Sequence, residues 1–192
     1  MSESQPSPGQ LVRTNCFALV AYIPGRLGEF LDQLRRDLEP NSLAPRAHLT
    51  LLPPRPLGAE VTAEAAQRYL AEALNEMPPL EVYLGAVEQF PVTNVVYVAV
   101  DGGFMQMRRT HGVLNSGPLC FAEPFHYHPH VTLAQGLDEP TSAAVYAAAR
   151  ERWAGYRGPR QFTVESFCFV QNTVGNRWID LADYTLSAPV IG

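Results

Sequence analysis

The chain of 192 residues contains one tetrapeptide pattern twice, as HLTL at residues 48–51 and as HVTL at residues 130–133. Successive side chains of a β-strand point to opposite faces of a sheet. Each copy therefore predicts a strand that presents a histidine and a threonine on one face and packs two apolar residues into a core on the other. Two such strands side by side would bring two imidazoles and two hydroxyls into one site.

The segments around the two copies follow the same order of predicted elements. For the first helix, the apolar residues Leu27, Leu31 and Leu34 recur at intervals of three to four, as on one face of an amphipathic helix. The first series is a strand at 16–24, a helix at 25–39, the motif strand at 46–52, a helix from about 62 to 77 and a strand at 80–90. The second series is a strand at 94–101, a helix at 104–115, the motif strand at 128–133, a helix at 141–156 and a strand at 161–172, with a last strand at 177–186.

A β-α-β-α-β unit that occurs twice predicts a molecule with pseudo-twofold symmetry. We expect an α+β fold in which the duplicated units form two lobes with antiparallel sheets around a central cleft. Residues 1–14 are predicted to be a flexible tail, because the first ten are rich in Ser, Pro and Gln. Residues 15–192 are predicted to form a single bilobal domain, since each half needs the other to complete the site.

The overall charge limits the possible partners. With 19 acidic and 14 basic residues the net charge is −5, which disfavours a broad binding face for duplex DNA. A small phosphorylated substrate is compatible with this charge.

The three cysteines are few and widely spaced, as in a reduced protein. No apolar run approaches the ~20 residues of a membrane span, and the first residues lack a signal-peptide pattern, so we expect a cytoplasmic monomer without membrane contact.

The two histidines and two threonines suit transfer at phosphorus. One imidazole must take a proton from the attacking oxygen and the other must give one to the leaving oxygen. Histidine serves both roles because its unperturbed pKa, about 6.5, lies near neutral pH. The threonine hydroxyls can donate to the non-bridging oxygens, where negative charge increases in the transition state.

The paired tetrapeptides, their contexts PRAHLTLLPPR and FHYHPHVTLA, and the duplicated layout resemble the 2H phosphoesterase superfamily, within it the 2′-5′ RNA ligase and cyclic phosphodiesterase-like branch. The resemblance extends from about Leu11 to Leu186. It implies a bilobal fold and catalysis without metal or cofactor on 2′,3′-cyclic or 2′-5′-linked phosphodiesters of nucleotides or RNA ends. It also implies that His48 and His130 are the acid and the base and that Thr50 and Thr132 hold the phosphate.

Strand alternation adds further candidates for substrate binding. Arg46 and His128 each lie two residues before a motif histidine, so both are expected to face the cleft. His126 lies two residues earlier still, where it could contact a base. Arg55 follows Pro53-Pro54 on what we expect to be a rigid loop within reach of the substrate, and Tyr22 ends the first strand. Phe125 and Tyr127 could stack on a nucleobase or pack inward.

Two alternative functions remain open at this point. His126, His128 and His130 alternate along one strand, and three imidazoles are a common zinc ligand set, which would make the protein a metal-dependent hydrolase. The fold could also bind RNA ends or phosphorylated nucleotides without turnover. The sequence does not specify the substrate, the direction of the reaction or which histidine is the base.

Overall fold

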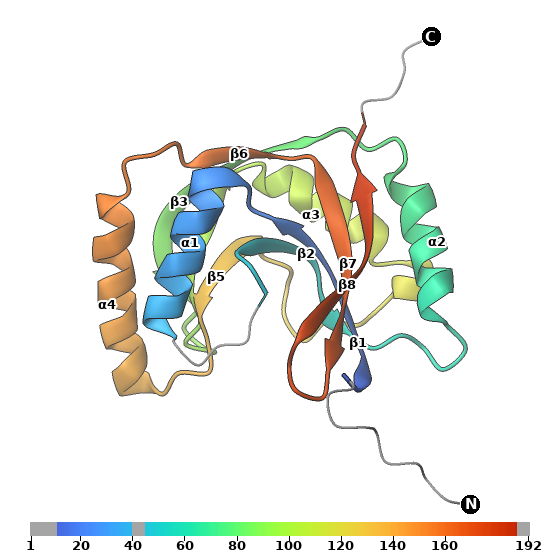
Figure 1. Cartoon of the computed structure of the whole chain (residues 1–192), viewed down its shortest axis with the longest axis horizontal. Helices are drawn as coiled ribbons and strands as arrows, with labels where there is room; N and C mark the ends of the chain where they lie inside the picture. Colours follow the sequence, from blue (N-terminus) through green and yellow to red (C-terminus); the bar gives the residue numbers. More distant parts are fainter. Residues whose placement is uncertain (1–10, 40–44, 188–192) are drawn as a thin grey trace, which may run out of the picture.

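The computed structural model describes residues 11–39 and 45–187 and contains two four-stranded antiparallel sheets with helices packed against them (Figure 1). Sheet A has the order β2-β1-β7-β8 and sheet B the order β5-β4-β3-β6. The strands are β1 (Arg13–Tyr22), β2 (His48–Arg55), β3 (Leu80–Gln89), β4 (Val96–Gly102), β5 (His130–Ala134), β6 (Gln161–Val164), β7 (Ser166–Thr173) and β8 (Trp178–Thr185). The helices are α1 (Gly25–Leu38), α2 (Ala63–Leu74), α3 (Phe104–Leu114) and α4 (Glu139–Gly155), with a short 3₁₀ helix, η1, at Gly117–Leu119. The predicted α+β class with two antiparallel sheets is confirmed.

The two halves of the chain exchange strands. β1 and β2 belong to sheet A, but β3, the last strand of the first half, pairs with β4 in sheet B. In return β7 of the second half pairs with β1 in sheet A. The predicted single strand at 161–172 is therefore two strands, interrupted at Glu165, where the chain passes from sheet B to sheet A. Each sheet thus needs both halves of the sequence.

The motif strands β2 and β5 lie at equivalent edges of the two sheets and contact each other near the centre of the molecule (Figure 1). Helices α1 and α3 also pack across the two halves of the chain. α1 joins two strands of sheet A but packs against β5, and α3 joins two strands of sheet B but packs against β2. Each motif strand therefore rests on a helix from the opposite half.

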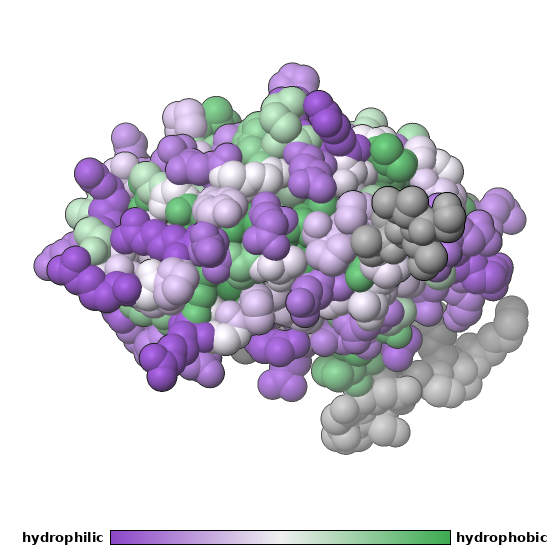
Figure 2. Space-filling model, turned by 90° about the horizontal axis from the view of Figure 1, so that it is seen from above, coloured by the Kyte–Doolittle hydropathy of each residue, from purple (hydrophilic) through white to green (hydrophobic). Residues whose placement is uncertain are grey.

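One main core joins both sheets and all four helices. Leu49 and Leu51 of β2 and Val131 and Leu133 of β5 are at most 1% exposed in it, as the alternation predicts. α1 and α4 lie side by side through contacts of Phe30 with Trp153 and Tyr156. On the face shown in Figure 2, apolar side chains appear in scattered spots among hydrophilic ones.

Helix capping explains one shifted boundary. Asp138 accepts a hydrogen bond from the Thr141 amide and starts α4 at Glu139, two residues before the predicted start. Thr62 caps α2 in the same way, as expected, and α2 ends at Leu74, before the predicted Met77.

The N-terminal boundary also differs from the prediction. β1 begins at Arg13 and so includes the last two residues of the predicted tail, because Arg13 pairs with Thr173 of β7 and the Thr14 hydroxyl donates to the Asn172 carbonyl. Residues 1–10 lie outside the described part of the chain. Within the described part, no helix is long and apolar enough to cross a membrane.

Candidate active site

The two copies of the motif have the same arrangement in the structure. Along β2 and along β5 the histidine and threonine are partly exposed and the residues between them are buried. His48 lies opposite Tyr22 and Thr50 opposite Val20 across the β1–β2 pair. The register between β4 and β5 repeats this, with His130 opposite Ala99 and Thr132 opposite Tyr97. The four residues are therefore presented from two equivalent edge strands.

Each motif histidine makes the same hydrogen bond to the backbone. Nδ1 of His48 lies 2.7 Å from the carbonyl oxygen of Arg46, and Nδ1 of His130 lies 2.6 Å from that of His128. A carbonyl only accepts, so Nδ1 carries the hydrogen in both rings. The Nε2 atom of each neutral ring then has a free lone pair, and among the described residues neither Nε2 has a hydrogen-bond partner. The two imidazoles are thus oriented for proton transfer through Nε2.

Both histidines are shifted toward the neutral form. Burial, together with smaller effects of the charges of Arg35 and His130, lowers the pKa of His48 to about 4, while the bond to the Arg46 carbonyl opposes the shift. Burial likewise lowers the pKa of His130, with a contribution from His128 in the same direction. The mutual effect of His48 and His130 means that protonating one ring makes it harder to protonate the other.

The threonines leave their hydroxyls available. Among residues 11–39 and 45–187, no protein group is hydrogen-bonded to the hydroxyl of Thr50 or of Thr132, although the Thr50 carbonyl accepts a bond from the Tyr127 hydroxyl at 2.8 Å. A hydroxyl beside an imidazole can donate to one non-bridging oxygen of a phosphate. Two imidazoles and two hydroxyls together could contact one phosphate group from both strands.

The segment that leads into β2 is held by α1. The amide of Ala47 donates to Asp32 Oδ1 at 2.5 Å, and its carbonyl accepts from the Ile23 amide at 3.0 Å. Arg35 donates to the Pro45 carbonyl at 2.6 Å. These three bonds fix the backbone just before His48.

Polar groups surround His48. The Tyr22 ring meets the His48 ring edge-on at 6.4 Å, and the Arg46 guanidinium lies 4.1 Å from the Tyr22 centroid. Tyr22 donates its hydroxyl to Asp180 Oδ1 at 2.6 Å, and burial together with this bond raises the pKa of the tyrosine. Tyr22 thus lies beside His48 with Arg46 over its ring, and Asp180, an exposed residue of β8, holds the tyrosine hydroxyl from a distant part of the sequence.

Aromatic rings surround His130. Phe90 stacks on Tyr97 with centroids 4.1 Å apart and meets the His130 ring edge-on at 5.1 Å. Tyr97 also contacts His130, at 5.2 Å, and Phe104 contacts His128 at 5.2 Å. Sequence analysis missed Phe90, Tyr97 and Phe104. No local sequence signal could have found them, because their places beside His128 and His130 depend on strand pairing and on the chain path at strand ends.

The structure corrects the predicted position of Arg55. It was expected on a loop that reaches the substrate, but β2 continues through both prolines to Arg55, whose side chain is 1% exposed. Its guanidinium pairs with Glu123 and also donates to Asn115 Oδ1 at 2.8 Å and to the Leu119 carbonyl at 3.1 Å. A buried cation needs such partners, and this leaves no exposed guanidinium surface for a substrate.

The other candidates in the second motif differ in exposure. His126 is exposed, and so is Phe125 at 62%, whereas Tyr127 packs inward, in agreement with the second of its two interpretations. The rings of His128 and His130 are 6.5 Å apart. In the described ranges no three His, Cys, Asp or Glu side chains are grouped to hold a metal ion, so the ligand set considered for His126, His128 and His130 is not formed.

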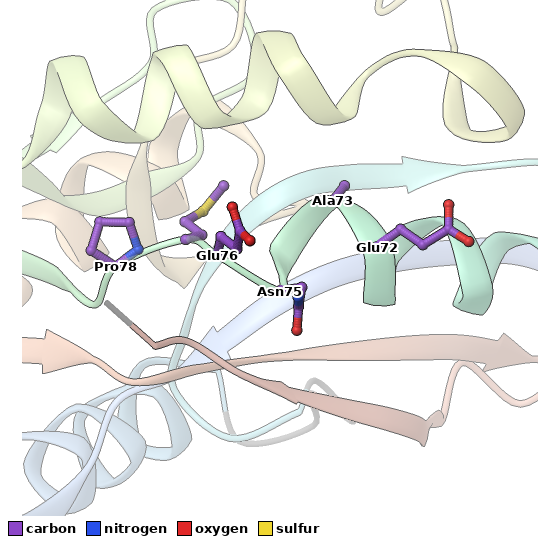
Figure 3. A pocket seen from close by; sticks show the side chains of 6 residues that line it. Glu72, Ala73, Asn75, Glu76 and Pro78 are labelled. Atoms are coloured by element: carbon purple, nitrogen blue, oxygen red, sulfur yellow. The ribbon is translucent and has the colours of Figure 1, made fainter. Parts of the chain in front are cut away.

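A separate open hollow lies at the C-terminal end of α2 and is lined by Glu72, Ala73, Asn75, Glu76, Met77 and Pro78 (Figure 3). It contains no histidine and none of the motif residues. We therefore assign the candidate active site to the two motif strands and not to this hollow.

Two antiparallel sheets whose edge strands each present a His-x-Thr pair define a 2H phosphoesterase fold. The family model of the 2′-5′ RNA ligase superfamily matches residues 23–176, and the chain belongs to this superfamily. The resemblance inferred from the two tetrapeptides is thus confirmed.

Individual relatives agree with this assignment. A Bacillus licheniformis protein, provisionally named a phosphoesterase, is 26% identical over 141 residues, which are 73% of this chain and 82% of that protein. The crystal structure of Escherichia coli LigT complexed with 3′-AMP is similar with a TM-score of 0.59 at 20% identity, over 93% of this chain and 99% of the other. A Thermus thermophilus protein gives 0.58 at 17% identity, over 91% and 99%. The family and the curated relative support phosphoesterase activity in general, and the structural likenesses show the fold.

Proposed function

We propose that the protein is a metal-independent phosphodiesterase that acts on 2′,3′-cyclic phosphates or 2′-5′ phosphodiester bonds of nucleotides or RNA ends. The observation that supports this most is the matched state of His48 and His130. Both donate Nδ1–H to a backbone carbonyl, have no partner at Nε2 among the described residues, and share a partly exposed strand face with a threonine. Chemistry that adds a proton at one oxygen and removes one at another needs such a pair.

The proposed hydrolysis of a cyclic phosphate requires two proton transfers, one from the attacking water to a histidine and one from the other histidine to the leaving oxygen. Nε2 of the neutral histidine takes a proton from a water molecule as its oxygen bonds to phosphorus. The bond from phosphorus to one ribose oxygen breaks, and the second histidine, protonated at Nε2, gives its proton to that oxygen. With a ribose hydroxyl in place of water, the same steps form a phosphodiester. The Thr50 and Thr132 hydroxyls donate to the non-bridging oxygens.

The unlike surroundings of the two histidines support a nucleotide as substrate. Phe90 and His128 are partly exposed and offer aromatic surface beside His130, with the buried Tyr97 ring stacked behind Phe90, and aromatic rings stack with bases. Arg46 offers a cation beside His48 for a phosphate. E. coli LigT, of the same fold, has been crystallised with 3′-AMP, ATP and NADP⁺. We propose that the substrate base lies on the His130 side and further phosphates on the His48 side.

The test is turnover of 2′,3′-cyclic AMP and of a 2′-5′-linked dinucleotide by purified protein in the presence of EDTA. His48→Ala and His130→Ala should each lower kcat/KM by about 10²–10⁴-fold, since each removes a general acid or base. Arg109→Ala, an exposed site on α3, is the control. Full activity in both histidine variants contradicts the proposal. Saturable binding without any product over prolonged incubation would instead identify a non-catalytic binder, and loss of activity with EDTA a metal-dependent hydrolase.

A further inference from the structure

The segment that precedes the second motif is bonded directly to the first motif. Tyr127 lies three residues before His130, and its hydroxyl donates to the backbone carbonyl of Thr50 at 2.8 Å. β2 is an edge strand of sheet A, so the outer side of its backbone has no strand neighbour in that sheet. The Tyr127 hydroxyl thus binds the backbone carbonyl of Thr50, and Thr50 is the residue whose side-chain hydroxyl is proposed to bind phosphate.

The Tyr127 ring has a fixed orientation. It stacks face to face on the His111 ring of α3, with centroids 4.0 Å apart and planes 4° apart. Nε2 of His111 in turn lies 2.9 Å from Glu123 Oε1. A stacked ring whose partner is itself hydrogen-bonded has little rotational freedom, so the Tyr127 hydroxyl is directed at β2.

A second connection joins the same group of residues to β2. Glu123 pairs with Arg55, which is the last residue of β2 and follows Thr50 by five positions. Arg55 also donates to Asn115 Oδ1 at 2.8 Å, at the end of α3. The cluster therefore joins β2 at both Thr50 and Arg55 to the segment between α3 and β5.

We propose that this closed ring of Thr50, Arg55, Glu123, His111 and Tyr127, here called the inter-motif clamp, sets the separation of the two His-x-Thr strands, with Tyr127 as a positioning residue. The inference rests on the proposed function, because the separation matters when both imidazoles must reach one phosphorus centre. β2 and β5 belong to different sheets and share no backbone ladder. Side-chain contacts must therefore fix their spacing, and an error of about 1 Å can cost about 10²-fold in rate.

Tyr127→Phe tests the clamp by removing one hydroxyl and keeping the stacked ring. We expect kcat on 2′,3′-cyclic AMP to fall about 10–100-fold while KM changes less than twofold, because the proposed base contacts beside His130 still hold the nucleotide while the geometry at phosphorus is lost. Tyr184→Phe is the matched control, since the Tyr184 hydroxyl also donates to a backbone carbonyl, that of Gln67 at 3.2 Å, away from the motif strands. It should leave kcat unchanged. A Tyr127→Phe variant with wild-type kcat, or one that raises KM alone, overturns the proposal.

His111→Phe removes a second contact of the inter-motif clamp, since it keeps an aromatic side chain stacked on Tyr127 but removes the Nε2 contact with Glu123. If the clamp acts as one unit, the double variant should lose little more kcat than Tyr127→Phe alone. Fully additive losses contradict a closed ring.

A readout that needs no turnover separates this inference from the proposed function. Inorganic phosphate added to wild-type protein should shift the imidazole NMR signals of His48 and His130 with one common Kd. Tyr127→Phe should weaken that Kd at least fivefold or separate the two responses, whereas Tyr184→Phe should not. If wild-type protein shows no turnover but this pattern holds, the proposed function fails and the clamp stands. An unchanged common Kd in Tyr127→Phe overturns the clamp.

Discussion

The backbone carbonyl of Arg46 accepts the Nδ1 hydrogen of His48 across 2.7 Å, and the carbonyl of His128 does the same for His130 across 2.6 Å. Residues two positions before each motif histidine were expected to act through their side chains. The structure shows that their backbones have a role as well, because each fixes the tautomer of the histidine that follows. This role tolerates many side chains at position −2, whereas a contact with the substrate does not.

Removing one threonine hydroxyl should slow the chemical step. Thr50→Val and Thr132→Val keep the branched shape and remove one donor to a phosphate oxygen. The expected loss in kcat is about 10²-fold, as for loss of one donor to a developing negative charge. Thr163→Val is the matched control, a partly exposed strand threonine whose hydroxyl bonds to Glu81 in sheet B. Equal kcat in all three variants, measured by steady-state kinetics, would rule out the proposed phosphate contacts.

The optimum of kcat/KM should lie on the acid side of neutrality. The free protein needs one neutral and one protonated histidine, and burial lowers the pKa of His48 to about 4 and that of His130 below 6.5. The singly protonated pair therefore decreases as the pH rises above 6.5. A profile of kcat/KM from pH 3.5 to 9 at constant ionic strength should peak below 6.5. A maximum at pH 8 would show that the two lowered pKa values do not control the reaction.

Stability should decrease over the same acid range. A folded-state pKa of about 4 for His48 lies below the unfolded value of 6.5, so the unfolded chain binds more protons between these limits. The contribution of neutral His48 is complete above pH 6.5 and is lost as the pH falls toward 4, at up to about 1.4 kcal/mol per pH unit. Urea titrations between pH 4.5 and 7.5 should therefore show a smaller slope of unfolding free energy with pH for His48→Gln than for wild type. Parallel slopes would contradict the shift.

Two arginine ion pairs should differ in what they contribute to stability. The pair of Arg55 and Glu123 has side chains 1% and 10% exposed, whereas that of Arg152 and Asp37 has side chains 40% and 38% exposed. Arg55→Met leaves a buried carboxylate without its cation and should cost about 3–5 kcal/mol of unfolding free energy. Arg152→Met should cost less than about 1 kcal/mol. Similar losses in the two variants, measured by chemical denaturation, would mean that the burial of Arg55 has no energetic consequence.

Local rules predicted the motif strands and the order of elements. His48, Thr50, His130 and Thr132 are on partly exposed faces because side-chain alternation follows from the geometry of an extended backbone. Arg55 was expected on a loop only because Pro53-Pro54 indicates the end of a strand. Proline is allowed on an edge strand, and β2 is one. The position of a strand within its sheet cannot be read from the strand itself.

By itself the sequence determined which residues share a face and that the chemistry-bearing unit occurs twice, since both follow from the spacing of neighbours along the chain. Only the tertiary structure decided that β3 and β7 change sheets, that Arg55 is buried with Glu123, and that Phe90 and Asp180 border the site. These features depend on pairing between segments distant in sequence. Such pairing is selected by the packing of the whole core, and it cannot be predicted from the spacing of residues along one segment.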